Sequence, residues 1–402
     1  MPESAVTDRL RKEDGLISPL RFPVAAGRLK RLDEKASELT DADLEVYLAI
    51  ISTELNSEQR ARISQPPQVY ARQETVLALH WHPEFIPMEL VLVRINATFP
   101  NREEELIIPT QHNTLLTLNG FAGVEIDCHS REFNRKIQLL AHFSEAKVQK
   151  ADVLKAMLQH TFRYRSSQLF EFLDSIIEPA FEDRLQLAAS YTGADADLVE
   201  FVRVNAGKLR SLIQMHEALT PPEAIKNKLV QHYFDSLRET YDDTLVNHAQ
   251  SFLKAVKEIV KARFALEYFY DTHQFLEEIR GLGGGVVIPH PEQFWPVLLA
   301  DYDVDGIEVW NPQSRDFTGF LINAVNRQNR ARPKGKRPLL ILMGDDTHMG
   351  EKARDPRLQD PEKAGREIGV QPAWEDLKIK KSLIVANADR GSVIREYMHR
   401  LG

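Results

Sequence analysis

Cysteine is almost absent from this chain, since Cys128 is the only one among 402 residues. A single cysteine excludes an internal disulfide and a zinc site built from several thiolates. Any metal ion must therefore be held by nitrogen and oxygen atoms. Long apolar runs are missing too, so we expect no membrane-spanning helix and no membrane association. The polar start of the chain, Met1 to Gly15, has no apolar signal-peptide core, and we expect a cytoplasmic protein.

Basic residues are also fewer than acidic ones, 51 against 59, so the formal net charge is −8. This balance disfavours a protein that coats nucleic acid. One dense basic stretch, Arg327 to Arg337, keeps nucleic-acid binding open as the less favoured alternative. The hydrophobic fraction of 43% and the charged fraction of 27% are typical of a globular protein. At this length we expect two units, or one large barrel with an insertion.

The texture of the sequence changes three times along the chain. Residues 1–73 are polar and predict a helical extension, whereas residues 74–149 contain short apolar runs separated by turns, typical of an α/β fold. Residues 150–280 predict an all-α insertion. Residues 281–402 return to the α/β texture and end in a helix.

Helix signals are strongest in the extension and in the insertion. Thr40, followed by acidic residues in the next turn, predicts a capped helix start. Residues 152–177 and 197–219 have helical periodicity, and Thr220 to Glu223 predicts the start of one or two long amphipathic helices. Their apolar stripes would form an intramolecular core or a homo-oligomer contact.

Polar residues that can bind metal follow several of the short apolar runs. His80-Trp81-His82 comes directly after one run, and Asp346-Thr347-His348 comes shortly after another. Because parallel strands gather their carboxyl ends at one face, residues far apart in sequence can meet there. Imidazole and carboxylate are the ligands that borderline divalent metals select. The predicted metal ligands are His80, His82, His112, Glu125, His142, His290, Asp346 and His348.

Two further acids stand at strand ends. Glu308 lies within Gly306-Ile307-Glu308-Val309, and Asp345 precedes Asp346. We expect these two carboxylates to orient the ligands or to act as general acid or base, rather than to bind metal themselves.

The chain resembles the polymerase and histidinol phosphatase (PHP) family of metal-dependent phosphoesterases. The motifs that carry the resemblance, in family order, are His80-Trp81-His82, Thr110-Gln111-His112-Asn113, Gly123-Val124-Glu125-Ile126, His142, Pro289-His290-Pro291, Gly306-Ile307-Glu308-Val309 and Asp346-Thr347-His348. The resemblance implies a seven-stranded (β/α) barrel, here with the helical extension and the large all-α insertion. It also implies two or three divalent ions, which would be zinc, manganese or iron.

The resemblance further implies a place for each ligand. His80, His82, Glu125 and Asp346 would hold a first ion. Glu125 would bridge to a second ion, which His142 and His290 would also hold. His112 and His348 would belong to a third.

The sequence departs from the family pattern at three positions and in the 148 positions that separate His142 from His290. Ala78 and Gln111 stand where the family usually has aspartate, and Met88 lies near the place of an acid or histidine. Glu84 or Glu89 could substitute for that missing ligand.

We predict a metal-dependent phosphoesterase that hydrolyses a phosphomonoester or phosphodiester by means of a metal-activated hydroxide. A small phosphorylated metabolite or nucleotide is the preferred substrate. Two alternatives stay open. The altered positions Ala78 and Gln111 favour a catalytically lapsed barrel that serves as a scaffold or interaction protein. A metal-dependent hydrolase of amidohydrolase type would also have an early His-Xaa-His and a late aspartate.

Overall fold

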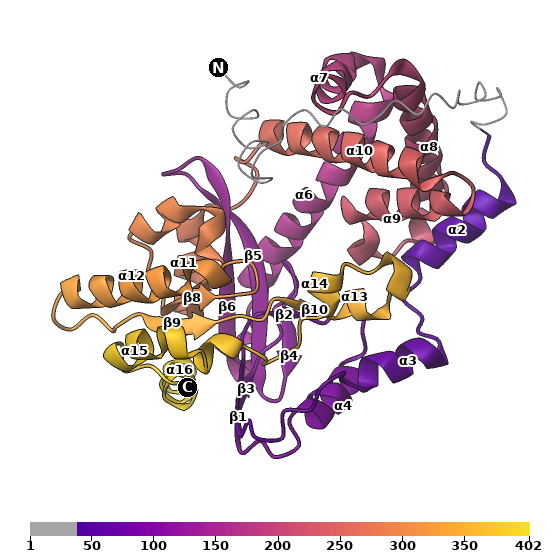
Figure 1. Cartoon of the computed structure of the whole chain (residues 1–402). Helices are drawn as coiled ribbons and strands as arrows, with labels where there is room; N and C mark the ends of the chain where they lie inside the picture. The colour runs from indigo at the N-terminus through magenta and orange to yellow at the C-terminus, as the bar shows by residue number, and fades with distance from the viewer. Residues whose placement is uncertain (1–37) are drawn as a thin grey trace. The chain divides into compact units, whose positions relative to one another are not determined.

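The computed structural model describes residues 38–402, which fall into two compact units (Figure 1). The helical unit contains residues up to 53 and residues 163–265, and the α/β unit contains residues 54–162 and 266–402. Residues 1–37 of the predicted extension lie outside the described part. No described helix is both long enough and apolar enough to cross a membrane.

The strands of the α/β unit form three separate sheets. In the largest, neighbouring strands follow the order β4-β5-β6-β7-β8-β9, antiparallel from β4 to β7 and parallel from β7 to β9. Its strands are β4 (Leu116–Leu118), β5 (Phe121–Ser130), β6 (Arg135–Ser144), β7 (Gly285–Ile288), β8 (Gly306–Trp310) and β9 (Leu340–Met343). Two parallel pairs complete the set, namely β1 (Thr75–Ala78) with β3 (Glu104–Ile107) and β2 (Trp81–His82) with β10 (Thr347–His348).

The prediction of a seven-stranded (β/α) barrel is therefore wrong, because the described strands do not close into one parallel sheet. Such a barrel needs a crossover helix between neighbouring parallel strands. Here β5 turns directly into β6 and pairs with it antiparallel, from Phe121 opposite Ser144 to Ser130 opposite Arg135. Asn134 supports the turn by adopting a φ of 47°. The coarser expectation of an α/β fold is confirmed.

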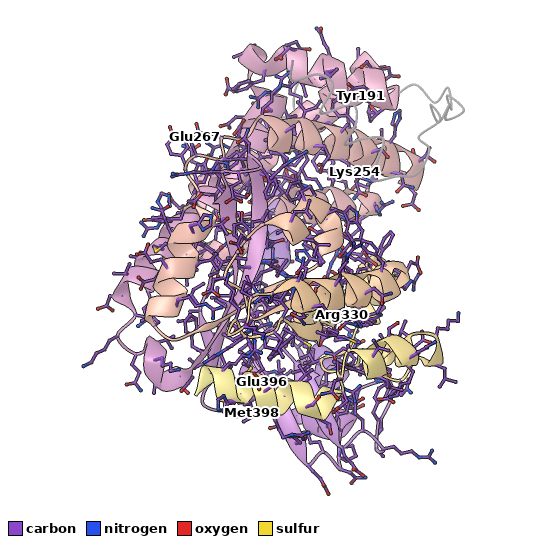
Figure 2. The ribbon with its side chains drawn as sticks, turned by 90° about the vertical axis from the view of Figure 1, so that its left-hand side faces the viewer. Tyr191, Lys254, Glu267, Arg330, Glu396 and Met398 are labelled. Carbon is purple, nitrogen blue, oxygen red and sulfur yellow. The ribbon has the colours of Figure 1, made fainter. Side chains whose placement is uncertain are left out.

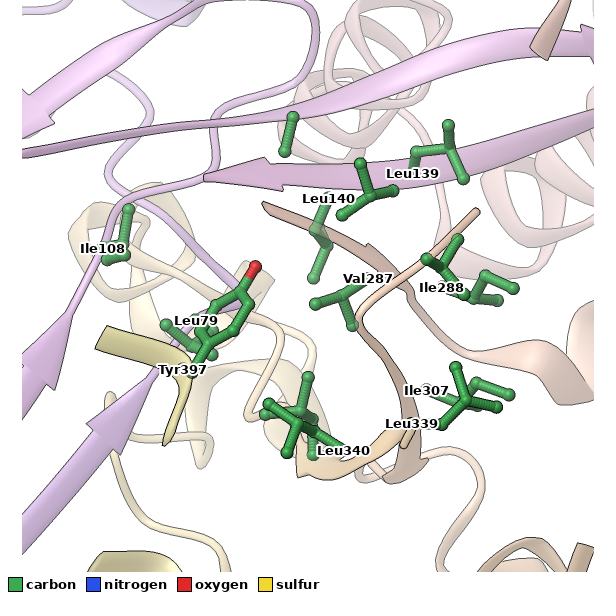
Figure 3. Close-up of a cluster of buried hydrophobic side chains, with 14 of the residues drawn as sticks. Leu79, Ile108, Leu139, Leu140, Val287, Ile288, Ile307, Leu339, Leu340 and Tyr397 are labelled. Carbon is green, nitrogen blue, oxygen red and sulfur yellow. The ribbon is translucent and has the colours of Figure 1, made fainter. Parts of the chain in front are cut away.

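The apolar faces of the strands contribute to a large hydrophobic core (Figure 3) and to a second, smaller cluster that includes Val76, Trp81 and Ile107. Helix α16 (Arg390–Leu401) contacts β1, β3, β6, β7 and β9, and thus links strands of different sheets. Its Tyr397 is fully buried, whereas the neighbouring Glu396 and Met398 remain exposed (Figure 2). The core side chains labelled around Tyr397 in Figure 3 include Leu79, Ile108, Leu140, Val287 and Leu340.

The remaining α-helices of the α/β unit lie before, between and after the strands. They are α3 (Ser57–Ser64), α4 (Met88–Thr98), α5 (Glu145–Val148), α11 (Thr272–Gly281), α12 (Thr318–Ala331), α13 (Met349–Ala353), α14 (Pro361–Ala364) and α15 (Leu377–Val385). Helix α6 (Asp152–Ile177) begins in this unit and continues into the helical unit.

The helices of the helical unit largely follow the sequence periodicity. Besides the second part of α6 they are α2 (Asp41–Ile51), α7 (Glu182–Thr192), α8 (Ala196–Met215), α9 (Lys228–Ser236) and α10 (Asp243–Arg263). The predicted helix over 152–177 is confirmed, and so is the capped start at Thr40, which forms a capping box with Asp43. The start predicted at Thr220 is wrong, because Pro222–Ala224 forms only a 3-10 turn.

Helix α2 packs within the helical unit. Tyr47 is fully buried, and its hydroxyl lies 2.6 Å from Thr220 Oγ1. One turn earlier, Lys208 Nζ donates to Asp43 Oδ2 at 2.9 Å. Helix α2 and the helices of the insertion therefore share one core.

The chain enters the helical unit after residue 162 and leaves it after residue 265, and these two crossings are neighbours. Within that unit the rings of Tyr164 and Phe264 lie 4.8 Å apart, between centroids. On the α/β side, His160 Nε2 hydrogen-bonds Tyr268 O at 2.8 Å. Each unit thus holds the two crossing segments together by contacts of its own.

Replacing Tyr47 by alanine tests the place of α2 in the helical unit. Loss of a large buried aromatic side chain should destabilise the helical unit by about 3–5 kcal/mol. Hydrogen exchange should then accelerate across residues 163–265 while β5 and β6 stay protected. The control is Leu48→Ala on the same helix, which removes a side chain that is 37% exposed and should change exchange little. Equal exchange in the two variants would contradict the assignment.

Candidate metal centre

The short parallel pair of β2 and β10 brings the two most distinctive motifs together. In its register His82 lies opposite His348, and their rings stack with centroids 4.3 Å apart. His112 also stacks on His82, at 4.4 Å between centroids, and lies 5.8 Å from the ring of His348. An isolated bridge joins His112 to Glu125 of β5, and so to the six-stranded sheet. His290 follows directly after β7.

Three overlapping groups of side chains can each hold a metal ion. Within each group, one potential ligand atom per residue lies within 4.8 Å of the others. The groups are His82 with His112 and His348, His80 with Glu125 and His290, and His80 with His82 and Asp346. Because His80 and His82 each belong to two groups, the positions adjoin one another.

The carboxylate of Glu125 faces two groups at once. Its Oε1 lies 3.7 Å from His80 Nε2 and 3.3 Å from His290 Nε2. Its Oε2 lies 3.7 Å from His82 Nε2 and also contacts His112 Nδ1. A carboxylate with its two oxygens directed to different imidazole pairs has the arrangement of a bridging ligand.

Asp346 presents a single oxygen to three histidines. Its Oδ1 lies 3.5 Å from His80 Nε2, 3.6 Å from His82 Nε2 and 3.4 Å from His348 Nε2. These N···O separations are longer than a typical hydrogen bond and leave space between the oxygen and the three ring nitrogens.

Glu308 fixes the orientation of His80. His80 Nδ1 donates to Glu308 Oε1 at 2.8 Å, which turns Nε2 toward Glu125 and Asp346. The other oxygen of Glu308 accepts from the backbone N–H of His290 at 2.8 Å. Gly344 makes this approach possible, because a Cβ there would lie 1.6 Å from Glu308 Oε1. A carboxylate behind a ligating histidine sets its tautomer and raises its basicity.

Glu84, rather than Glu89, reaches the centre. Its Oε1 lies 3.4 Å from His348 Nδ1, whereas Glu89 is exposed on α4. Gly350 provides the space, since a Cβ there would lie 2.2 Å from Glu84 Oε2. Gln111 serves the same loop, because its Oε1 accepts from the backbone N–H of Glu84.

His142 is not in any of the three groups, although the sequence placed it among the ligands. Both of its ring nitrogens are used in hydrogen bonds. Nε2 donates to the carbonyl of Leu79 at 2.9 Å, so Nδ1 accepts from the Tyr397 hydroxyl at 2.8 Å. The lone pair that a metal would need is therefore engaged.

Asp345 is also outside the groups. Its Oδ1 accepts from the backbone N–H of Thr347 at 3.1 Å and its Oδ2 from that of Gly369 at 2.9 Å. Burial raises the pKa of this carboxyl to about 7 despite these hydrogen bonds. Its contacts hold the backbone on both sides of the ligand segment.

The electrostatics of the centre favour positive charge. Burial lowers the pKa of His80, but Glu308, Asp346 and Glu125 outweigh it and raise this pKa to about 10. Burial also lowers the pKa of His348, yet Asp346 and Glu84 raise it to about 9. Burial and the neighbouring His348 and His112 lower the pKa of His82 to about 3. Carboxylates that stabilise protons on nearby imidazoles would also attract a divalent cation, which would replace those protons.

Backbone conformation at the centre is strained. His290, Asp346 and Glu84 adopt left-handed φ values of 30°, 46° and 54°. Such conformations cost about 1–3 kcal/mol each for residues other than glycine, and they cluster at functional sites. No sequence signal marked these three turns.

The side chains at the centre fit a cation of the zinc, manganese or iron class. The Nε2 atoms of His80 and His82 are buried and make no hydrogen bond. Buried polar atoms usually have partners, and an ion is one explanation for those that do not. Nitrogen and oxygen donors in these proportions suit borderline divalent metals.

No protein-family model matches the sequence. No curated protein matches it. Among solved structures the chain is similar to one from Bifidobacterium adolescentis that is described as a candidate metal-dependent phosphoesterase, with 16% sequence identity and a TM-score of 0.39. The match covers 84% of this chain and 97% of that one. Membership of the PHP family stays a prediction from the motifs.

Because His142 is buried, the free energy of unfolding should fall as the pH decreases. Burial lowers its pKa from 6.5 to about 4. The unfolded chain therefore binds this proton between about pH 6.5 and 4 while the folded chain does not, and stability falls as pH decreases through that range, by about 3 kcal/mol at most. Denaturant unfolding of metal-free protein at several pH values measures this slope.

His142→Gln should reduce the slope by about one proton, whatever its effect on stability at neutral pH. His399→Gln, which replaces an exposed histidine, is the control for the substitution itself. An unaltered slope in His142→Gln would show that another group is responsible.

Proposed function

We propose that this chain is a metal-dependent phosphoesterase. The observation that supports the proposal most strongly is the overlap of the three ligand groups, which share His80 and His82. In addition, Glu125 and Asp346 each face histidines of more than one group. Adjoining cation positions that share carboxylates are typical of hydrolases that act on phosphate esters.

Each group would hold one ion. We assign Glu125 as the bridge between the position at His80 and His290 and the position at His82 and His112, because its two oxygens face these pairs separately. Asp346 would serve the positions at His80, His82 and His348 through Oδ1. Bound divalent ions would supply Lewis-acid chemistry, neutralising charge on phosphoryl oxygens and making a water nucleophile available near neutral pH.

The side chains of the centre differ in how exposed they are to solvent. The side chains of His80, His82 and Glu125 are at most 1% exposed, whereas those of His112 and His348 are 28% and 21% exposed. A substrate would therefore approach from the side of His112 and His348. The inner histidines would be shielded from bulk water, which strengthens electrostatic interactions with a phosphoryl group.

Glu308 and Asp345 would act by positioning. Glu308 holds His80 and the backbone of His290, and Asp345 holds the backbone at Thr347 and Gly369. We propose small phosphorylated compounds as substrates, because the net charge of −8 is unfavourable for a polyanion.

The proposal is tested by metal analysis of the purified chain together with phosphate release from a panel of small phosphomonoesters and phosphodiesters. Manganese, zinc and iron(II) would each be added to metal-free protein. We expect at least two ions per chain and hydrolysis that a chelator removes and the metal restores. Fewer than one ion per chain would favour a scaffold, and cleavage of oligonucleotides alone would contradict the small-substrate assignment.

His82→Gln should remove both metal and activity, because His82 contributes to two of the groups. We expect at least one fewer ion per chain and a loss of activity of about 100-fold or more, as for loss of a direct ligand. Glu89→Gln, which changes an exposed acid on α4, is the matched control and should retain both. Full metal content in His82→Gln would contradict the assignment of this histidine.

A further inference from the structure

Arg366 reaches back to Asp346 from a loop that the sequence motifs do not include. Its Nη1 donates to Asp346 Oδ2 at 2.6 Å and to the carbonyl of Asp346 at 3.1 Å. The Arg366 side chain is only 5% exposed. A guanidinium that bonds both the side chain and the backbone of one residue fixes the side-chain torsion between them.

Because of this contact, the two carboxylate oxygens of Asp346 have different partners. Oδ2 is held by Arg366, so Oδ1 is the oxygen that faces His80, His82 and His348. The carboxylate group is therefore held at one oxygen by Arg366 while the other oxygen faces the histidines.

The loop that carries Arg366 is itself held from three sides. Lys352 Nζ donates to the carbonyls of Ala364 and Arg366. Next along the chain, Glu367 accepts from Arg94 through both carboxylate oxygens, at 2.7 and 2.5 Å. Gly369 N–H then donates to Asp345. The segment from Ala364 to Gly369 is thus a rigid support behind the ligand segment.

We propose that Arg366 is a positioning residue that presents Asp346 to the cations through Oδ1 alone. The inference rests on the proposed function, because it assumes that cations bind beside Asp346. A supporting residue of this kind, once removed, typically lowers metal affinity by about 10- to 100-fold.

A purely electrostatic role for Arg366 leads to the opposite result. A buried positive charge near a cation site repels the cation, so its removal alone would tighten metal binding. The sign of the change in affinity therefore separates positioning from charge. Arg366→Met removes both the charge and the fork, whereas Arg366→Lys keeps the charge and loses the planar fork.

The experiment is titration of the full-length, metal-free chain with Mn²⁺, followed by calorimetry and by the electron paramagnetic resonance spectrum of the bound ion. We expect Arg366→Met and Arg366→Lys both to weaken the tightest Mn²⁺ site by about 10- to 100-fold. Both should also broaden the spectrum, because the carboxylate is no longer fixed. Glu362→Gln is the control, since the exposed Glu362 is the more distant partner of Arg366, at 3.8 Å.

Unchanged or tighter binding in either Arg366 variant would overturn the inference while leaving the proposed function standing. A wild-type chain that takes up no Mn²⁺, Zn²⁺ or Fe²⁺ would overturn both. If Arg366→Met fails to fold, Arg366→Lys still decides the question, because it keeps the buried charge paired. A double variant with Asp346→Asn should bind no more weakly than Asp346→Asn alone if Arg366 acts through Asp346.

Discussion

Several carboxylates buried beside imidazoles are the constraint on which the rest of the α/β unit depends. Glu125 and Glu308 are 1% exposed, and an uncompensated buried charge costs several kcal/mol. Each acid here has assigned partners: Glu308 accepts from His80, from the backbone of His290 and from Asn311, and Asp346 accepts from Arg366. The loops after β7 and β9 must fold so that these donors arrive together, and left-handed backbone at His290 and Asp346 is part of the cost.

The sequence predicted most of the centre because few residue types can bind a metal without cysteine. His80, His82, His112, Glu125, His290, Asp346 and His348 were all predicted, and the structure brings them into the three groups. His142 was predicted for the same reason, since it also follows an apolar run. Only its contacts with Leu79 and Tyr397 distinguish it from a ligand, and these lie 63 and 255 positions away in the chain. A pattern along the sequence cannot report such distant partners.

The fold was predicted less well for a related reason. Helical periodicity is local, and α6 appears where the spacing predicts it. Strand pairing is not local: nothing in the apolar runs distinguishes the antiparallel β5 and β6 from neighbouring strands of a parallel barrel. Arg366 was not predicted because it lies in an irregular loop. Gly344 and Gly350 were not predicted because their role is to leave space for Glu308 and Glu84. A glycine offers no side chain for a motif, and a single arginine gives no sign along the sequence of the residue that it contacts.

The adjacent crossing points of the helical unit bear on how the chain folds. The two segments of the α/β unit are separated by residues 163–265, and closing a flexible loop of about 100 residues costs roughly 4 kcal/mol of chain entropy. If the helices fold first, the contact between Tyr164 and Phe264 brings the loop ends together before any strand of one segment meets the other. The helical unit would then act as an internal template, shortening the search by which β6 finds β7.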